Sequence, residues 1–223
     1  MPATSTARLL SLHLGKIETF GPAGQPSAIG KHTVGSRITV SKLGLAGDEQ
    51  ADTQHHGGID KALHHYPFEH YAAWTRELPA KTALFKAGGF GENLSTQGLS
   101  EDNVCLGDIF QIGSATIQVS QGRKPCWKLN HRFGIANMSR RVQDCGRTGW
   151  YYRVLDTGDM AQGDAFALIE RPHPEWTLAR LLKVIYQEKA DYEALAALAR
   201  LSVLTLSWHE MVDKRLSGDQ IRR

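Results

Sequence analysis

The stretch LGDIFQIGSATIQVS, residues 106–120, alternates apolar and polar side chains on both sides of the pair Gly113-Ser114. Such alternation predicts strands that bury one face, and a glycine-containing pair suits a tight turn with positive backbone angles. We therefore predict a β-hairpin in this stretch.

Short runs of β-branched and alternating residues extend from residue 8 to about residue 170, and glycines interrupt them at short intervals. This pattern is typical of an all-β barrel or sandwich. The candidate strands are residues 9–14, 16–20, 28–34, 37–43, 103–112, 115–119, 150–155 and 164–170.

Helical patterns occur within this region and after it. Residues 67–78 predict a helix, because Pro67 suits a first turn and Tyr71 and Trp74 recur on one face. A shorter helix is expected near residues 137–144. After Arg171, prolines break the chain and the apolar period becomes helical, which predicts three short helices. We place a boundary there, with domains 1–170 and 171–223.

Composition limits the function classes. The chain has 223 residues, of which 41% are hydrophobic and 22% are charged, and its net charge is +3. This balance gives no reason to expect a nucleic-acid partner. No apolar run is long enough for a membrane span or a signal peptide, so we expect no membrane partner and a cytoplasmic location. Three cysteines without C-x-x-C spacing predict reduced thiols.

The segment SQGRKPCWKLN, residues 120–130, surrounds Cys126 with Arg123, Lys124 and Lys128. Nearby cations favour the thiolate form, which ligates soft or high-valent metals, and the surplus charge can hold an anion. The alternative is that Cys126 is a small buried hydrophobic residue and that the cations are solvated. Residue chemistry alone leaves both interpretations open.

Cys105 and Cys145 differ from Cys126 in their surroundings. Cys105 stands on an expected strand with no adjacent cation, which favours an inert core thiol. Cys145 has Arg147 nearby, at the end of an expected helix, and we also expect a structural role for it.

The segment HHGGIDKALHHYPFEH, residues 55–70, contains five of the ten histidines. Its spacing does not match a zinc motif, and the glycines predict a loop that enters a strand. Such a loop can present His56, Lys61 and His64 to an anionic ligand, although packing or solvated histidines are the alternative. The polar segments GLAGD and GEN place further candidates at strand ends, namely Asp48, Glu92 and Asn93.

Five segments together resemble the MOSC domain, in particular its YiiM-type bacterial members. They are LGLAGDEQAD (43–52), HHGGIDKALHHYP (55–67), FGENLST (90–96), LGDIFQIG (106–113) and SQGRKPCWKLN (120–130). Each motif is weak alone, but five in this order are specific. The resemblance covers nearly the whole chain, since the last three expected helices, with RLSG near the end, look like the small helical domain of that group.

The resemblance implies a mainly β fold with α-helices: a MOSC β-barrel-like domain followed by a three-helix (3-alpha) domain. It implies a molybdenum cofactor in the molybdopterin form, with Cys126 as the metal ligand and catalytic residue. We expect the cofactor pocket around Cys126 to include these further candidate binding residues: Arg123, Lys128, Lys61, Asn93, Glu92, His56 and His64.

Relatives of this type reduce N-hydroxylated substrates, including toxic purine base analogues such as hydroxylaminopurine. The resemblance also implies that a separate flavoprotein reductase delivers the electrons. The sequence itself has no flavin, haem or iron–sulfur signature, so we expect an external electron donor. The alternative is a protein that carries the cofactor or sulfur without turnover. Pyridoxal phosphate is not expected, although MOSC domains also occur fused to pyridoxal-phosphate enzymes, because the chain has no room for that domain.

Overall fold

The computed structural model describes residues 7–52 and 57–220. The strands are β1 (Ala7–Gly15), β2 (Glu18–Phe20), β3 (Gln25–Ser27), β4 (Lys31–Val34), β5 (Ile38–Ser41), β6 (Gly44–Leu45), β7 (Leu63–Pro67), β8 (Leu94–Gln97), β9 (Ile109–Ile112), β10 (Ala115–Gly122), β11 (Trp150–Asp156), β12 (Gly158–Met160) and β13 (Ala165–Glu170). The helices are α1 (Glu69–Glu77), α2 (Trp127–Phe133), α3 (Met138–Cys145), α4 (Leu178–Tyr186), α5 (Tyr192–Leu198) and α6 (Leu206–Gln220), with 3-10 turns η1 (Ile59–Lys61) and η2 (Pro79–Leu84).

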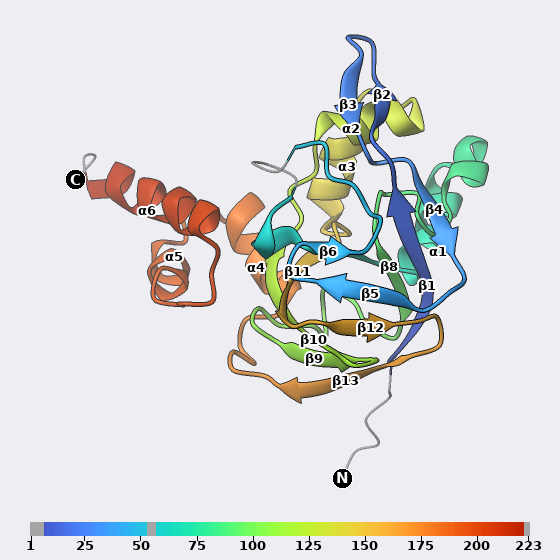
Figure 1. The fold of residues 1–223 in the computed structure, drawn as a ribbon. Helices are drawn as coiled ribbons and strands as arrows, with labels where there is room; N and C mark the ends of the chain where they lie inside the picture. Colours follow the sequence, from blue (N-terminus) through green and yellow to red (C-terminus); the bar gives the residue numbers. More distant parts are fainter. Residues whose placement is uncertain (1–6, 53–56, 221–223) are drawn as a thin grey trace.

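The main sheet closes into a barrel of seven strands in the order β13-β9-β10-β11-β7-β8-β1, and β1 pairs back onto β13 (Figure 1). Strand β4 extends the sheet from the other end of β1. Every pairing in the barrel is antiparallel except that of β7 with β8. The predicted barrel is confirmed, and closure removes the unpaired edges that an open sheet would expose.

Strands β9 and β10 form the predicted hairpin, with Ala115 opposite Ile112. Gly113 at the turn has φ 57°, and a Cβ there would lie 2.1 Å from the carbonyl oxygen of Asp159. The expected strand 103–112 begins at Ile109 instead. Residues before it form a turn in which the Asp108 carboxylate accepts the Cys105 N–H at 2.9 Å.

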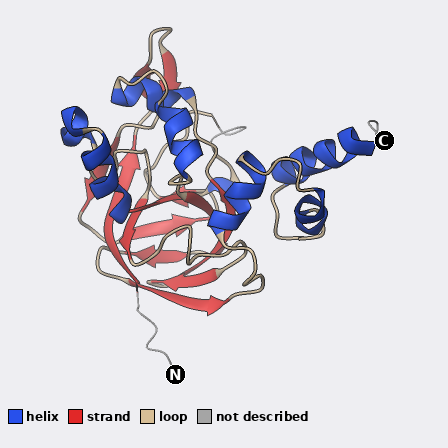
Figure 2. Cartoon of the chain, turned by 180° about the vertical axis from the view of Figure 1, so that it is seen from behind, coloured by secondary structure: helices blue, strands red, loops and turns tan. Residues whose placement is uncertain are grey.

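Helices α1, α2 and α3 lie beside the barrel (Figure 2). Their buried side chains form a second hydrophobic core, which is rich in aromatic residues. The Tyr66 and Phe90 rings stack at 4.2 Å, and Phe133 from α2 lies 4.8 Å from Phe90. The helix expected at 67–78 is confirmed, but it begins at Glu69 because Pro67 ends strand β7. Helix α3 is confirmed near 137–144, while α2 was not predicted.

The three predicted C-terminal helices are confirmed, with Thr177 and Asp191 as N-caps of α4 and α5. Helix α4 packs against β10, and α5 and α6 extend outward from it (Figure 1). Their apolar residues join the barrel core in one cluster, so the boundary at residue 170 stays a prediction. In the described part of the chain, no helix combines the length and apolarity that a bilayer span requires.

Candidate functional site

A cavity of about 90 Å³ opens beside the barrel, where the loop after β10 meets the loop before β7. Its charged lining consists of four cationic side chains, Lys31, Lys61, Arg123 and Lys128, and three acidic ones, Asp48, Glu49 and Asp52. The cationic side chains outnumber the acidic ones, so the lining favours an anionic ligand. We call it the cationic cavity.

Cys126 lines the cationic cavity and stands at the N-cap of α2. Its backbone is extended, with φ −130° and ψ 170°, because the chain leaves β10 through Pro125 before it coils into the helix. The thiol is half-buried, whereas Cys105 is 1% exposed. Of the three cysteines, Cys126 is the one that lines this cavity.

Arg123 adds a buried positive charge to the lining of the cationic cavity. The residue is 5% exposed, and its Nη1 has no hydrogen-bond partner among the described residues. Its backbone is fixed by a bond from Arg123 N–H to the Gly149 carbonyl at 3.0 Å. A buried guanidinium is costly unless an acceptor completes its hydrogen bonds, so this side of the cavity favours an anion.

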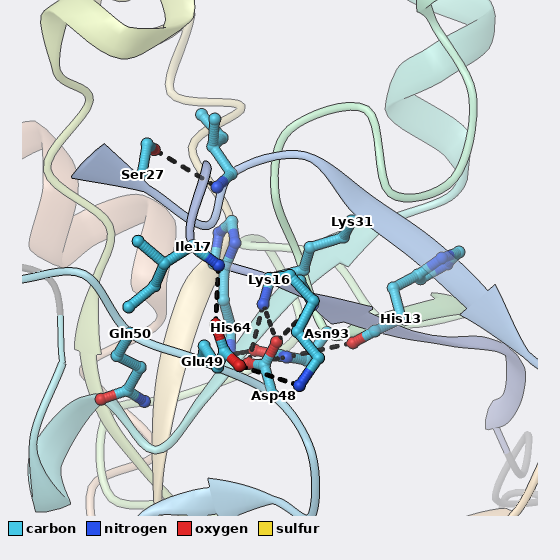
Figure 3. A network of polar contacts seen from close by, with 12 residues as sticks. His13, Lys16, Ile17, Ser27, Lys31, Asp48, Glu49, Gln50, His64 and Asn93 are labelled. Atoms are coloured by element: carbon cyan, nitrogen blue, oxygen red, sulfur yellow. Dashed lines mark hydrogen bonds and ion pairs between the residues drawn. The ribbon is translucent and has the colours of Figure 1, made fainter. Parts of the chain in front are cut away.

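Lys31, Asp48 and Asn93, which also line the cationic cavity, form a buried polar network (Figure 3). The Lys31 ammonium donates to both Asp48 oxygens at 2.6 and 2.7 Å, and Asn93 Nδ2 donates to Asp48 Oδ2 at 2.7 Å. Burial lowers the pKa of Lys31, while the Asp48 carboxylate opposes that shift. The network ties β4, the β6–β7 loop and the start of β8 together around the cavity.

Replacing Lys31 with methionine is expected to destabilise the protein by about 3–5 kcal/mol. The two side chains are 7% and 5% exposed, so the variant leaves Asp48 as a buried carboxylate without its cation. Urea unfolding measures the change. Lys16→Met is the matched control, because the Lys16–Glu49 pair is 58% and 40% exposed. Equal losses in the two variants would contradict the structural role given to Lys31.

His64 lines the cationic cavity from β7. Its ring centroid lies 5.0 Å from that of Tyr151, and its Nε2 has no hydrogen-bond partner among the described residues. Burial first, and then the Arg123 charge, hold the pKa of His64 well below its ordinary value. The imidazole is therefore neutral near neutral pH, with one ring nitrogen available to a ligand.

Acid is expected to destabilise the fold through its buried histidines. Burial holds the pKa of both His64 and His65 below 6.5, so below that pH the unfolded chain binds protons that the folded chain does not. Stability is then lost as pH falls, by about 1.4 kcal/mol per pH unit for each histidine. Urea unfolding at about pH 7.5 and 5.5 measures the slope. The His64→Gln variant should lose less unfolding free energy between these two pH values. An unchanged loss would exclude the His64 contribution.

The structure brings seven of the sequence candidates to one cavity: Cys126, Arg123, Lys128, Lys61, Asp48, Asn93 and His64. Their binding of a cofactor stays a prediction. His56 lies outside the described residues. Lys31 and Tyr151 also line the cavity and were not predicted. Neither carries a local signal, since each looks like an ordinary strand residue until the barrel closes.

Glu92 is a correction, because it faces the aromatic core instead of the cavity. Its carboxylate accepts the Gly88 N–H at 2.5 Å, the Phe90 N–H at 3.0 Å and the Ser95 hydroxyl at 3.0 Å. The Tyr71 hydroxyl is a further donor. These four donors satisfy a fully buried carboxylate, which gives Glu92 a structural role in holding the loop before β8.

Comparison with known proteins identifies the class. The MOSC domain family model matches residues 52–167, and the YiiM-like, 3-alpha helix domain model matches residues 176–219. The chain therefore belongs to the MOSC family, and it carries the YiiM-like combination of a MOSC domain with a 3-alpha domain. The predicted family and fold class are confirmed.

Among similar proteins, Protein YiiM from Escherichia coli is 42% identical, over 94% of this chain and 93% of that protein. A protein named Reductase from Gibberella moniliformis is 37% identical over 92% of this chain, which spans 37% of that longer protein. The crystal structure of YiiM from Geobacillus stearothermophilus has a TM-score of 0.81 and 33% identity, covering 94% of this chain and 99% of that one.

Proposed function

We propose that this protein is a molybdenum cofactor-dependent reductase of N-hydroxylated substrates, and that the Cys126 thiolate is its ligand to molybdenum. The position of Cys126 carries the proposal. It lies where the cationic cavity meets a second cavity, which is lined by Tyr151, Tyr186 and Trp208 as well as by charged side chains. One thiol therefore borders both an anion site and a space with ring surfaces for an organic substrate. MOSC family membership and a relative named Reductase support a redox role.

The residues of the cationic cavity fit the molybdopterin form of the cofactor. Cys126 offers a soft thiolate donor, which suits a metal already held by sulfur ligands. The buried Arg123 guanidinium has an unpaired Nη1, and Lys128 adds charge on the same side of the cavity, which suits the cofactor phosphate. Lys31 and Asn93 keep their bonds to Asp48 and shape the cavity that would hold the pterin.

The reaction requires two electrons and two protons: R–NHOH + 2e⁻ + 2H⁺ gives R–NH₂ and water, with cleavage of the N–O bond. When bound, the molybdenum cofactor supplies the two-electron change. In this proposal the electrons come from a separate flavoprotein, the donor class that the family resemblance implies. The chain's own residues bind and orient the reactants.

Tyr151 and His64 are the candidates for positioning protons. Burial raises the pKa of Tyr151, so its phenol keeps its proton and remains a hydrogen-bond donor, although Arg123 opposes that shift. Neutral His64 lies beside it, and because its ring already bonds the Gly91 backbone, its unpartnered Nε2 is available as a hydrogen-bond acceptor. Both line the cavity that Cys126 borders, so both can orient a substrate hydroxyl group.

The test uses protein produced in a host that makes the cofactor. Molybdenum per chain is measured by mass spectrometry, and reduction of hydroxylaminopurine is followed with reduced viologen as the artificial electron donor. The proposal expects stoichiometric molybdenum and formation of the amine. Bound molybdenum without turnover would favour the carrier function instead, and protein that binds no molybdenum would contradict both.

A further inference from the structure

The second cavity, of about 450 Å³, lies between the barrel and the C-terminal helices, and we call it the helix-side cavity. Ser207, Trp208 and Met211 of α6 form part of its lining. Lys61 of η1 lines both this cavity and the cationic cavity. The positions of η1 and α6 therefore determine the shape of the space around the candidate site.

Arg153 of β11 connects these two elements. Its Nε donates to the Asp60 carboxylate of η1 at 2.9 Å, and its Nη2 donates to the Val203 carbonyl at 3.1 Å. Val203 lies in the turn before α6. The Arg153 Nη1 donates at 3.2 Å to Oε1 of Gln118, the residue opposite Arg153 on β10. One guanidinium thus binds acceptors from three segments that are far apart in sequence.

The barrel holds η1 through both the backbone and the side chain of Asp60. Ser120 Oγ donates to the Asp60 carbonyl at 2.5 Å, in addition to the bond from Arg153 to the carboxylate. Lys61 is the next residue, and its N–H donates to the Gly58 carbonyl at 3.0 Å. Because a guanidinium has five donors in one rigid plane, it fixes its acceptors relative to each other. Arg153 therefore sets the place of η1 relative to the turn before α6.

We propose that Arg153 is a positioning residue for the candidate site. Through Asp60 it holds Lys61 at the junction of the two cavities, and through Val203 it holds the wall that α6 provides. Arg153 is outside the described lining of both cavities, so it acts through other residues. The proposal rests on the proposed function for the part that Lys61 takes in cofactor binding.

Amide hydrogen exchange measures the positioning, in protein produced in a host that makes the cofactor. Two backbone groups report on the two elements: the Lys61 N–H, and the Trp208 N–H, which donates to the Thr205 carbonyl at 3.0 Å. Arg153→Gln should speed exchange at both about tenfold, since each element loses a charge-assisted hydrogen bond. Asp60→Asn weakens one of these bonds, so it should speed exchange at Lys61 and leave exchange at Trp208 unchanged.

Arg180→Gln is the matched control. Arg180 is exposed on α4 and donates to the Glu175 carbonyl at 2.9 Å, and its guanidinium lies 4.3 Å from the centre of the Trp176 ring. These contacts stay within residues 175–180, away from η1 and the turn before α6. The variant should match the unmodified protein in every measurement.

Release of molybdenum separates a positioning role from a general structural one. Mass spectrometry follows the loss of molybdenum during dialysis of Arg153→Gln, Lys61→Met and the double variant. Release should be faster by about fivefold for Arg153→Gln and about tenfold for Lys61→Met. The double variant should release metal no faster than Lys61→Met, because Arg153 reaches the cationic cavity through Lys61.

The outcomes distinguish this proposal from the proposed function. Unchanged exchange at Lys61 in the Arg153→Gln variant would overturn the positioning role, and so would additive effects of the two substitutions on molybdenum release. Faster exchange in a chain that binds no molybdenum would support the positioning of Lys61 and contradict the proposed function.

Discussion

Replacing Cys126 with serine is expected to abolish turnover and to remove most of the bound molybdenum. A neutral hydroxyl is a far poorer ligand than a thiolate for a sulfur-bound metal. The fold should survive, because Cys126 is half-buried and belongs to neither hydrophobic core. Metal content per chain, viologen-driven reduction and urea unfolding measure the three effects on one preparation.

Cys105→Ser is the matched control for this prediction. Cys105 is buried, and its thiol donates to the Pro174 carbonyl at 3.6 Å, a bond that a serine hydroxyl can also make. Burial, together with Asp108, raises the pKa of Cys105, so this thiol is not prepared to bind metal. The control should keep its molybdenum and activity. A Cys126→Ser protein with full metal content and turnover would refute the proposed ligand.

The elements that the sequence predicted correctly are those whose conformation depends on residues close together in the chain. The β9–β10 hairpin follows from strict alternation around Gly113, and the C-terminal helices follow from apolar residues at helical spacing after Arg171. In the structure, Thr177 and Asp191 cap α4 and α5. The cysteine among cations at Cys126 was also visible in one short segment, and the structure places it in a cavity.

Features that depend on barrel closure could not be predicted. Strand β7 reads as polar because it contains His64 and His65, yet all five of its residues are buried. His65 satisfies both ring nitrogens with partners distant in sequence, the Tyr152 hydroxyl at 3.0 Å and the Thr96 hydroxyl at 2.7 Å. A buried histidine of this kind has no signature before its partners are placed.

The contrast between Glu92 and Asn93 shows the same limit at the site. The two residues are adjacent and equally polar, and both were assigned to the pocket. The Asn93 amide reaches Asp48 at the cationic cavity, whereas the Glu92 carboxylate binds Tyr71 and nearby backbone amides beside the aromatic core. Which neighbour faces the ligand depends on the direction of the chain as it enters β8, and composition does not encode that direction.

Truncation after Glu170 is expected to leave a chain that does not fold. The removed residues Trp176, Leu181, Ile185 and Trp208 share one hydrophobic cluster with the barrel. Each such side chain contributes about 1.5–3 kcal/mol by burial, so the four together contribute about 6–12 kcal/mol, which is comparable with the roughly 5–15 kcal/mol that stabilises an ordinary domain. Solubility and cooperative urea unfolding measure the effect.

Backbone hydrogen bonds also connect the barrel to the segment that truncation removes. Leu106 N–H donates to the Trp176 carbonyl at 2.9 Å, and Leu178 N–H donates to the Val104 carbonyl at 2.8 Å, so truncation also leaves barrel groups unpaired. A chain ending after Ser217 keeps these contacts and the cavity walls, and it should remain folded and loaded with molybdenum. A soluble, cooperatively unfolding 1–170 chain that retained molybdenum would show that the barrel is independent of the helices. The same chain folded but without metal would show that the helices belong to the cofactor site itself.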